Sequence, residues 1–139
     1  MIMGNEEVDK TKLFLFEEFK GRSDGVEKIV YIPSVISNES ELYDYLNHQL
    51  NFPDYFGRNW DALADLLSYL SWLKEEKIYL IHGEMPFQNS LELQKHYVSI
   101  LAFVMARRKK VDDEKLIVIF SPKNKNEIMR LLKDIDIVV

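Results

Sequence analysis

Three short apolar runs along the chain predict buried β-strands. They are KIVYIP at residues 28–33, KIYLIH at 77–82 and LIVIF at 116–120. Short runs that are rich in valine and isoleucine are typical of strands. The third run is apolar throughout, which is expected when both faces of a parallel sheet are covered.

Between these runs, apolar residues recur at the spacing of amphipathic helices. We expect helices over residues 39–50, about 59–73, from 89 or 90 to about 110, and 127–133. Ser37 or Asn38 is suited to cap the first helix, and Asn59 the second. Strands that alternate with helices predict an α/β fold, with a small three-stranded parallel sheet, helices packed on it and right-handed crossovers.

The two ends of the chain are less regular and could add edge strands to this sheet. Alternation over residues 8–20 favours a strand, although Phe16 and Phe19 would also fit one face of a helix. GRSDG at 21–25 predicts a turn, and 135–139 is a terminal apolar run. A chain of 139 residues suits one domain, which we expect to span 1–139.

Composition is that of a soluble globular protein, with 47% hydrophobic and 29% charged residues. There is no cysteine, which excludes disulfides and thiolate metal sites. The first ten residues lack the apolar core of a signal peptide, and the apolar run at 13–16 is far too short to span a membrane. We therefore expect a cytoplasmic protein without membrane contact.

Charge narrows the class of partner. The formal net charge is −5, so the phosphates of a nucleic acid would repel the chain, and we expect no direct nucleic-acid binding. A basic protein is a better partner, because opposite charges steer association. The basic cluster RRKK at 107–110 falls at the expected end of a helix, where cations favour the helix dipole, and this explains it better than RNA binding does.

The run NFPDYFGRNWDALADLLS at 51–68 joins a tight aromatic loop to the second expected helix. We expect Gly57 to adopt a positive φ before the helix, which Asn59 can cap. Tyr55 and Phe56 are neighbouring aromatic residues. We expect one of them to fill the core and the other to be exposed. An exposed Tyr55 would suit an interface anchor, because tyrosine is enriched at binding hot spots.

The second expected helix carries acidic and apolar residues on opposite sides. Asp61, Asp65, Ser68 and Trp72 share one stripe, and the side that should face the core carries Trp60, Leu63, Leu67 and Leu70. On the residues alone, a solvated polar face is the first interpretation. Carboxylates that replace phosphate groups in a basic groove are the second, and a general acid–base pair, which needs a cleft to separate two pKa values, is the third.

Other signals of catalysis or cofactor binding are missing from the sequence. His48, His82 and His96 have no metal-ligand spacing, and His82 at a strand end suits a packed residue better than a catalytic base. Neither a glycine-rich phosphate loop nor a nucleophile elbow occurs. We expect no enzyme activity, no metal and no cofactor.

The loop and helix at 51–68 resemble the barstar family of ribonuclease inhibitors. The family pattern is a Pro-acid-Tyr-aromatic-Gly loop followed by Asn-x-Asp-Ala-Leu-x-Asp. Here it stands as Pro53-Asp-Tyr-Phe-Gly57 and Asn59-Trp-Asp-Ala-Leu-Ala-Asp65. The resemblance covers about residues 28–121, which would be the core of the domain, and leaves extensions at 1–27 and 122–139.

This resemblance implies an intracellular inhibitor that plugs the active site of a basic, extracellular-type ribonuclease with the loop and the acidic helix. Asp65 would stand where the substrate phosphate sits and would meet arginines and a histidine of the nuclease. Tyr55 would pack on the rim of the nuclease. Asn59 and Asp61 would add polar contacts and Gly57 backbone contacts, and we include Ala64 and Ser68 in the same expected surface.

The sequence departs from the family pattern at two places. A bulky tryptophan just before the key aspartate is Ala64 here, and an acidic contact near the end of the last long helix is replaced by the basic residues 107–110. The identity of the nuclease therefore stays open. The alternatives are an immunity or binding module for another toxin or partner on the same fold and, less favoured, a small enzyme that uses Asp61 and Asp65.

Overall fold

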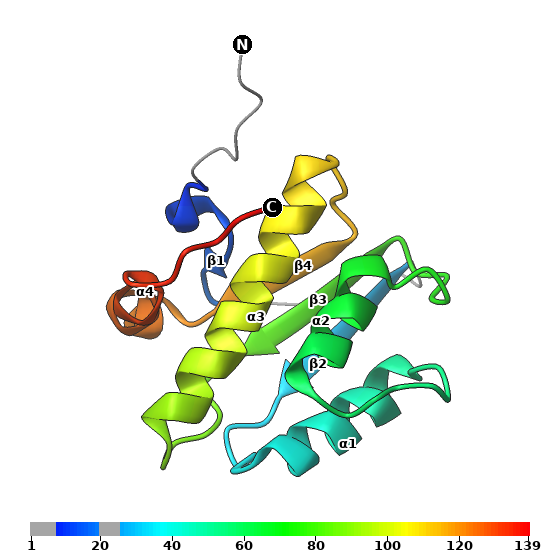
Figure 1. Ribbon diagram of the computed structural model, residues 1–139, viewed down its shortest axis with the longest axis horizontal. Helices are drawn as coiled ribbons and strands as arrows, with labels where there is room; N and C mark the ends of the chain where they lie inside the picture. The colour runs from blue at the N-terminus through cyan, green and yellow to red at the C-terminus, as the bar shows by residue number, and fades with distance from the viewer. Residues whose placement is uncertain (1–7, 20–25) are drawn as a thin grey trace.

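A four-stranded parallel sheet forms the centre of the fold (Figure 1). The computed structural model describes residues 8–19 and 26–139, so the turn expected at 21–25 lies outside the described residues. The strands are β1 (Leu15–Phe16), β2 (Glu27–Ile32), β3 (Lys77–His82) and β4 (Leu116–Phe120), in the spatial order β1-β4-β3-β2. The α/β class and the parallel core of β2, β3 and β4 are as expected.

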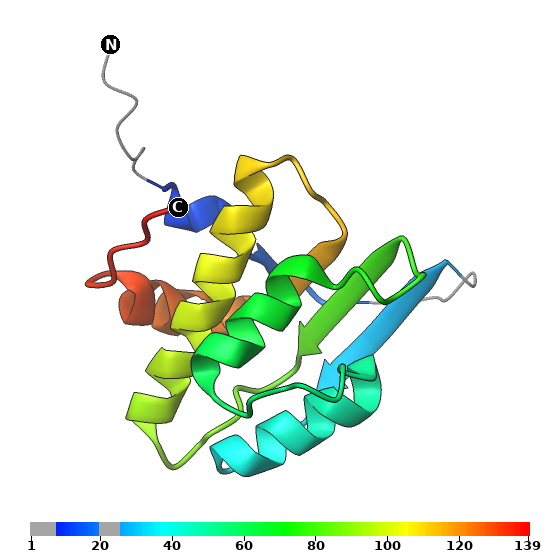
Figure 2. The ribbon, with the colours of Figure 1, turned by 45° about the vertical axis from the view of Figure 1, so that its right-hand side comes forward.

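The main helices are α1 (Glu39–Leu50), α2 (Trp60–Tyr69), α3 (Leu91–Lys110) and α4 (Lys125–Leu132), with 3-10 turns η1 (Lys10–Lys12) and η2 (Pro122–Asn124). The side chains of Asn38, Asn59 and Ser90 cap the first three helices by accepting a backbone N–H from the first turn. Helices α2 and α3 pack side by side across one face of the sheet (Figures 1 and 2). No helix in the described part of the chain is long and apolar enough to cross a membrane.

The ends of the chain behave differently from each other. Residues Leu15 and Phe16 pair with Ile119 and Phe120 of β4, so the N-terminal extension does add an edge strand. The C-terminal strand expected at 135–139 is wrong: these residues form an irregular tail beside α3, with Ile137 buried in the core. Burial of an apolar side chain against the helices replaces strand pairing there.

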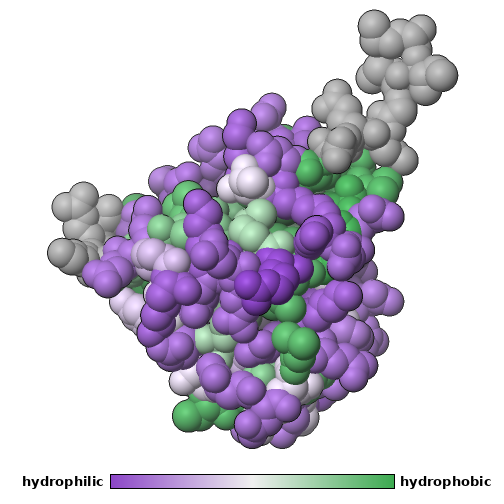
Figure 3. All heavy atoms as spheres, turned by 90° about the vertical axis from the view of Figure 1, so that its left-hand side faces the viewer, coloured by the Kyte–Doolittle hydropathy of each residue, from purple (hydrophilic) through white to green (hydrophobic). Residues whose placement is uncertain are grey.

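Seen from the α4 side, the surface is mostly hydrophilic with small hydrophobic patches (Figure 3).

Helix α2 is shorter than expected. It ends at Tyr69, because Leu70 turns into the left-handed region with φ 48° and its N–H binds the carbonyl of Leu66. Trp72 therefore lies beyond the helix and not on the stripe of Asp61 and Asp65. Its indole N–H donates to the carbonyl of Leu50 at 2.9 Å, which ties the end of α2 to the end of α1.

His82 is buried where β3, β4 and α3 meet, as a packed residue. Its ring stacks on Phe120, its Nδ1 donates to the carbonyl of Ile119 at 2.9 Å, and its Nε2 accepts from the hydroxyl of Tyr97 at 2.6 Å. Burial lowers the pKa of His82 to about 4, against the smaller opposing effect of the Ile119 carbonyl. The folded protein thus holds a neutral imidazole at neutral pH.

This burial makes stability depend on pH. Between pH about 6.5 and about 4, the unfolded chain binds a proton on His82 that the folded chain does not bind. We expect His82 to contribute a loss of about 3 kcal/mol in the free energy of unfolding as the pH falls through this window. Urea unfolding at several pH values measures it, with the exposed His48→Gln variant as control. A His82→Gln variant that keeps the full pH slope would contradict this assignment.

Candidate functional site

The loop between α1 and α2 is set by two residues in the left-handed region, Asn51 and Arg58, each with φ 52°. The expectation of a positive φ at Gly57 is wrong, since Gly57 lies outside that region. The guanidinium of Arg58 is held on α1, where it donates to Asp44 at 2.7 Å and to Ser40 at 3.1 Å. Bonds to α1 thus hold the loop that precedes α2.

The two aromatic neighbours in this loop have opposite roles. Phe56 is half-buried and packs edge to face against Phe52 and Tyr43, with ring centroids 4.9 and 5.6 Å apart. Tyr55 is 79% exposed. The expectation of one core aromatic and one exposed aromatic is confirmed, and Tyr55 is the exposed one. A large, exposed aromatic ring on a braced loop has the properties of an interface anchor.

The exposed side of α2 carries Asp61 and Asp65, as the spacing predicts. Ala64 between them is 6% exposed and lies at the base of the same side. Ser68 is half-buried, and its hydroxyl donates to the Ala64 carbonyl at 2.7 Å, so its proton is used within the helix. The opposite side holds the core, with Leu63, Leu67 and Leu70 fully buried and Trp60 partly buried.

Asp65 has a neighbour that the sequence did not reveal. Arg107 of α3 places Nη1 3.6 Å from Oδ1 of Asp65 and donates from Nη2 to the hydroxyl of Tyr69 at 3.2 Å. The same guanidinium lies over the rings of Phe103 and Tyr69, 5.2 and 5.7 Å from their centroids. The basic end of α3 therefore contacts the acidic face of α2, beyond any interaction with its own helix dipole.

Two hollows flank Asp65. The first has a volume of about 360 Å³ and lies toward the loop, lined by Tyr55, Asp65, Leu66, Tyr69, Ser71 and Trp72. The second has a volume of about 450 Å³ and lies over α3, lined by residues of α2, α3 and the C-terminal tail. Asp65 thus stands between two recesses. Neither hollow is lined by His82 or His96.

The structure brings together most of the expected residues and adds three. Tyr55, Asn59, Asp61 and Asp65 are exposed on the loop and on α2, whereas Ala64 is 6% exposed and lines the second hollow. Tyr69, Arg107 and Asp136 join them as lining residues of the two hollows. Tyr69 follows Asp65 by four residues, so helical spacing could have found it. No group of three or more metal-binding side chains is placed to hold an ion in the described parts of the chain.

Two comparisons with known proteins bear on the family of this chain. The model of the family described as Barstar (barnase inhibitor) matches residues 28–121. A protein of Bacillus subtilis (strain 168), named "Putative ribonuclease inhibitor YrdF", is 31% identical over 94 residues, which are 68% of this chain and 99% of that protein. The match includes the loop and α2 and ends just after β4, so β1, α4 and the tail lie outside it. The chain therefore belongs to the barstar family.

Proposed function

We propose that this chain inhibits a ribonuclease by covering its active site with the loop at 51–58 and the exposed side of α2. One observation carries the proposal: the Asp65 side chain is 69% exposed at the centre of a surface that includes Tyr55 and Asp61, on a helix capped by Asn59. The family match and the name of the relative from Bacillus subtilis support the same function.

The chemistry of the target explains the acidic centre. A ribonuclease binds the phosphates of RNA, so its active site is positively charged, and a carboxylate can occupy the place of a phosphate group. The net charge of −5 would also speed the encounter with a basic enzyme. The partner is thus a basic ribonuclease of the extracellular type, which the chain would inhibit in the cytoplasm.

The other site residues have supporting roles in this proposal. Tyr55 packs on the rim of the nuclease, while Asp61 and Asn59 add polar contacts and Gly57 offers its backbone. Ala64 leaves space beside Asp65, and Ser68, whose hydroxyl donates to the Ala64 carbonyl, belongs to the same surface. We also propose that residues 1–139 form one domain, since Leu13 and Ile137 from the two extensions belong to the same buried cluster as α2 and α3.

Inhibition can be measured directly. The purified chain is titrated into small basic ribonucleases secreted by the organism that makes it, and the initial rate of cleavage of a fluorescent RNA is followed. We expect activity to disappear at one equivalent of the chain for at least one of these enzymes. Full activity of every such enzyme with the chain in excess would contradict the proposed function.

The pairing of Asp65 with Arg107 favours one alternative function, which is the neutralisation of a toxin other than a ribonuclease. A surface whose central acid is already shared with a cation also suits a toxin that is not a ribonuclease and carries both charges at its binding site. Binding to a toxin without any loss of ribonuclease activity in the titration above would favour this alternative.

Tyr55 gives a prediction that separates binding from folding. Replacing Tyr55 by alanine should weaken binding to the ribonuclease about 5- to 30-fold, because a large contact ring is lost. The midpoint of thermal unfolding should stay unchanged, because the ring is 79% exposed in the free chain. Tyr31→Ala, which removes a 55% exposed ring on β2, is the matched control and should bind as the unmodified chain does. Equal affinities of the two variants would exclude Tyr55 from the interface.

A further inference from the structure

The C-terminal tail, residues 133–139, is held in a defined position beside α3. Lys10 of η1 donates from Nζ to the carbonyl of Leu132 at 2.7 Å, where the tail leaves α4. Farther along, Ile137 is 8% exposed and belongs to the core cluster. In the ribbon views, the tail and α2 lie on opposite sides of α3 (Figures 1 and 2). The tail is thus held at its start, next to Leu132, and again at Ile137.

The second hollow beside Asp65 is the groove between these two walls. Its volume is about 450 Å³. One wall is α2, with Asp61, Ala64 and Asp65, and the other is the tail, with Ile135, Asp136 and Ile137. Between the walls lies α3, which contributes Ser99, Ile100, Phe103 and Arg107. The groove therefore has carboxylates on both walls and a floor that is apolar at Ile100 and Phe103, with Arg107 next to Asp65.

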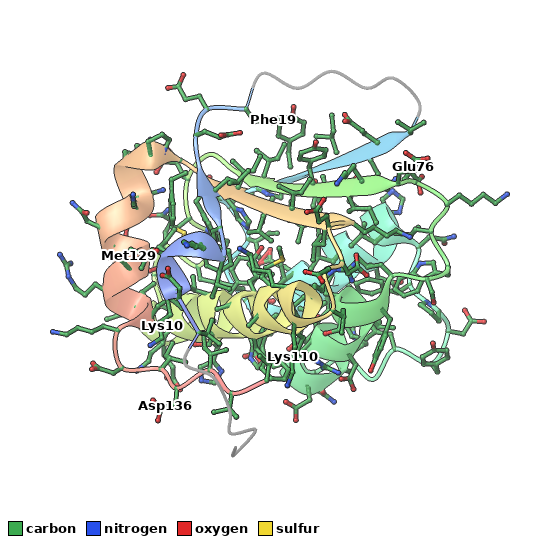
Figure 4. The ribbon with its side chains drawn as sticks, turned by 90° about the horizontal axis from the view of Figure 1, so that it is seen from above. Lys10, Phe19, Glu76, Lys110, Met129 and Asp136 are labelled. Carbon is green, nitrogen blue, oxygen red and sulfur yellow. The ribbon has the colours of Figure 1, made fainter. Side chains whose placement is uncertain are left out.

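The charges around this groove are not balanced by ion pairs among the described residues. Arg107 pairs with Asp65 at 3.6 Å. Asp61 and Asp136 are exposed and form no ion pair within residues 8–19 and 26–139. Asp136 points outward from the tail (Figure 4). Two carboxylates on facing walls thus remain available to a cation that enters from outside.

We propose that this groove receives a basic side chain, an arginine or a lysine, from the partner protein, and that the tail is the second wall of the interface. The apolar stem of such a side chain would lie over Ile100 and Phe103, and its charge would lie between Asp61 and Asp136. The proposal rests on the proposed function for the nature of the partner. Because the tail lies outside the family match, Asp136 would select among ribonucleases for this particular chain.

Charge reversal at one tail position tests the proposal. Asp136→Lys should weaken binding to the inhibited ribonuclease by about tenfold or more, because a repulsion replaces an attraction. Asp134→Lys changes the net charge equally, two residues earlier in the same tail, at an exposed position that does not line the groove. It should change the affinity less than about threefold. Equal losses in both variants would overturn the role of Asp136.

A second measurement does not depend on any ribonuclease. The methyl resonances of Ile100 and Ile137 are followed by NMR while acetyl-arginine amide is added, with acetyl-glutamine amide as the neutral probe. We expect saturable shifts with the arginine probe only, and smaller shifts in Asp136→Lys. Shifts without inhibition of any ribonuclease would support the groove and contradict the proposed function. Inhibition without these shifts would contradict the groove alone.

Discussion

Replacing Asp65 by alanine should weaken binding to the ribonuclease by at least about 30-fold, or about 2 kcal/mol. In the complex, the carboxylate would meet the cations that normally hold the RNA phosphate. Removing it would leave those cations buried without a counter-charge, and this accounts for most of the expected loss. It would also leave Arg107 facing the positive site of the enzyme without its acidic neighbour.

The fold should tolerate this change, so its effect on binding can be measured separately from its effect on stability. The Asp65 side chain is 69% exposed, and exposed ion pairs such as its contact with Arg107 contribute about 0–1 kcal/mol to stability. Affinity is measured by titration of labelled ribonuclease, and stability by urea unfolding. Asp134→Ala removes an exposed aspartate elsewhere and is the matched control. If Asp65→Ala binds as tightly as this control, the centre of the interface lies elsewhere.

Replacing Arg108 by methionine should lower the free energy of unfolding by about 3–5 kcal/mol. Arg108 is only 2% exposed, although its neighbours 109 and 110 are exposed. Its Nη1 donates to the carbonyls of Leu67 and Ser68 at 3.0 and 2.7 Å, and its Nη2 donates to Oδ1 of Asp113 at 2.9 Å. These bonds fasten the end of α2 to the end of α3. Methionine fills much of the space but leaves the two carbonyls without the Arg108 donor, and Asp113 keeps only its bond from the backbone N–H of Lys115.

The neighbouring arginine provides the control for this prediction. Arg107→Met removes a charge of the same sign from the same helical turn, but its contacts with Asp65 and Tyr69 lie at the surface. It should lower the free energy of unfolding by no more than about 1 kcal/mol. The two variants are compared by urea unfolding at the same pH. Equal stabilities would mean that Arg108 does not carry the contact between α2 and α3.

The sequence predicts much of the fold because its strands are strongly marked. Both β3 and β4 have the bounds expected from their apolar runs, and the caps Asn38, Asn59 and Ser90 are among those expected. The sequence does not predict that α2 ends at Tyr69, because the left-handed residue that follows the helix is Leu70 and not a glycine. The C-terminal tail was misjudged because an apolar run predicts burial but not the element against which it is buried.

In the candidate site, too, the sequence predicts the local features but not the contacts between distant segments. Exposure of Asp61 and Asp65 follows from helical periodicity, which is a local feature, whereas the loop sequence predicted one exposed aromatic residue without deciding between Tyr55 and Phe56. The neighbours of Asp65 come from α3 and from the tail, and such contacts depend on how α2 packs on α3. The sequence showed a basic cluster at the end of a helix, but the helix dipole alone was an adequate explanation for it.

Competition at the phosphate-binding site of the ribonuclease tests most directly whether Asp65 takes the place of a phosphate. The affinity of the chain for a ribonuclease that it inhibits is measured by fluorescence titration at increasing concentrations of a mononucleotide that occupies this site. We predict that the apparent Kd rises in proportion to the mononucleotide concentration once the site is saturated. An apparent Kd that stays constant at saturating mononucleotide would show that both bind at once and would contradict a plug centred on Asp65.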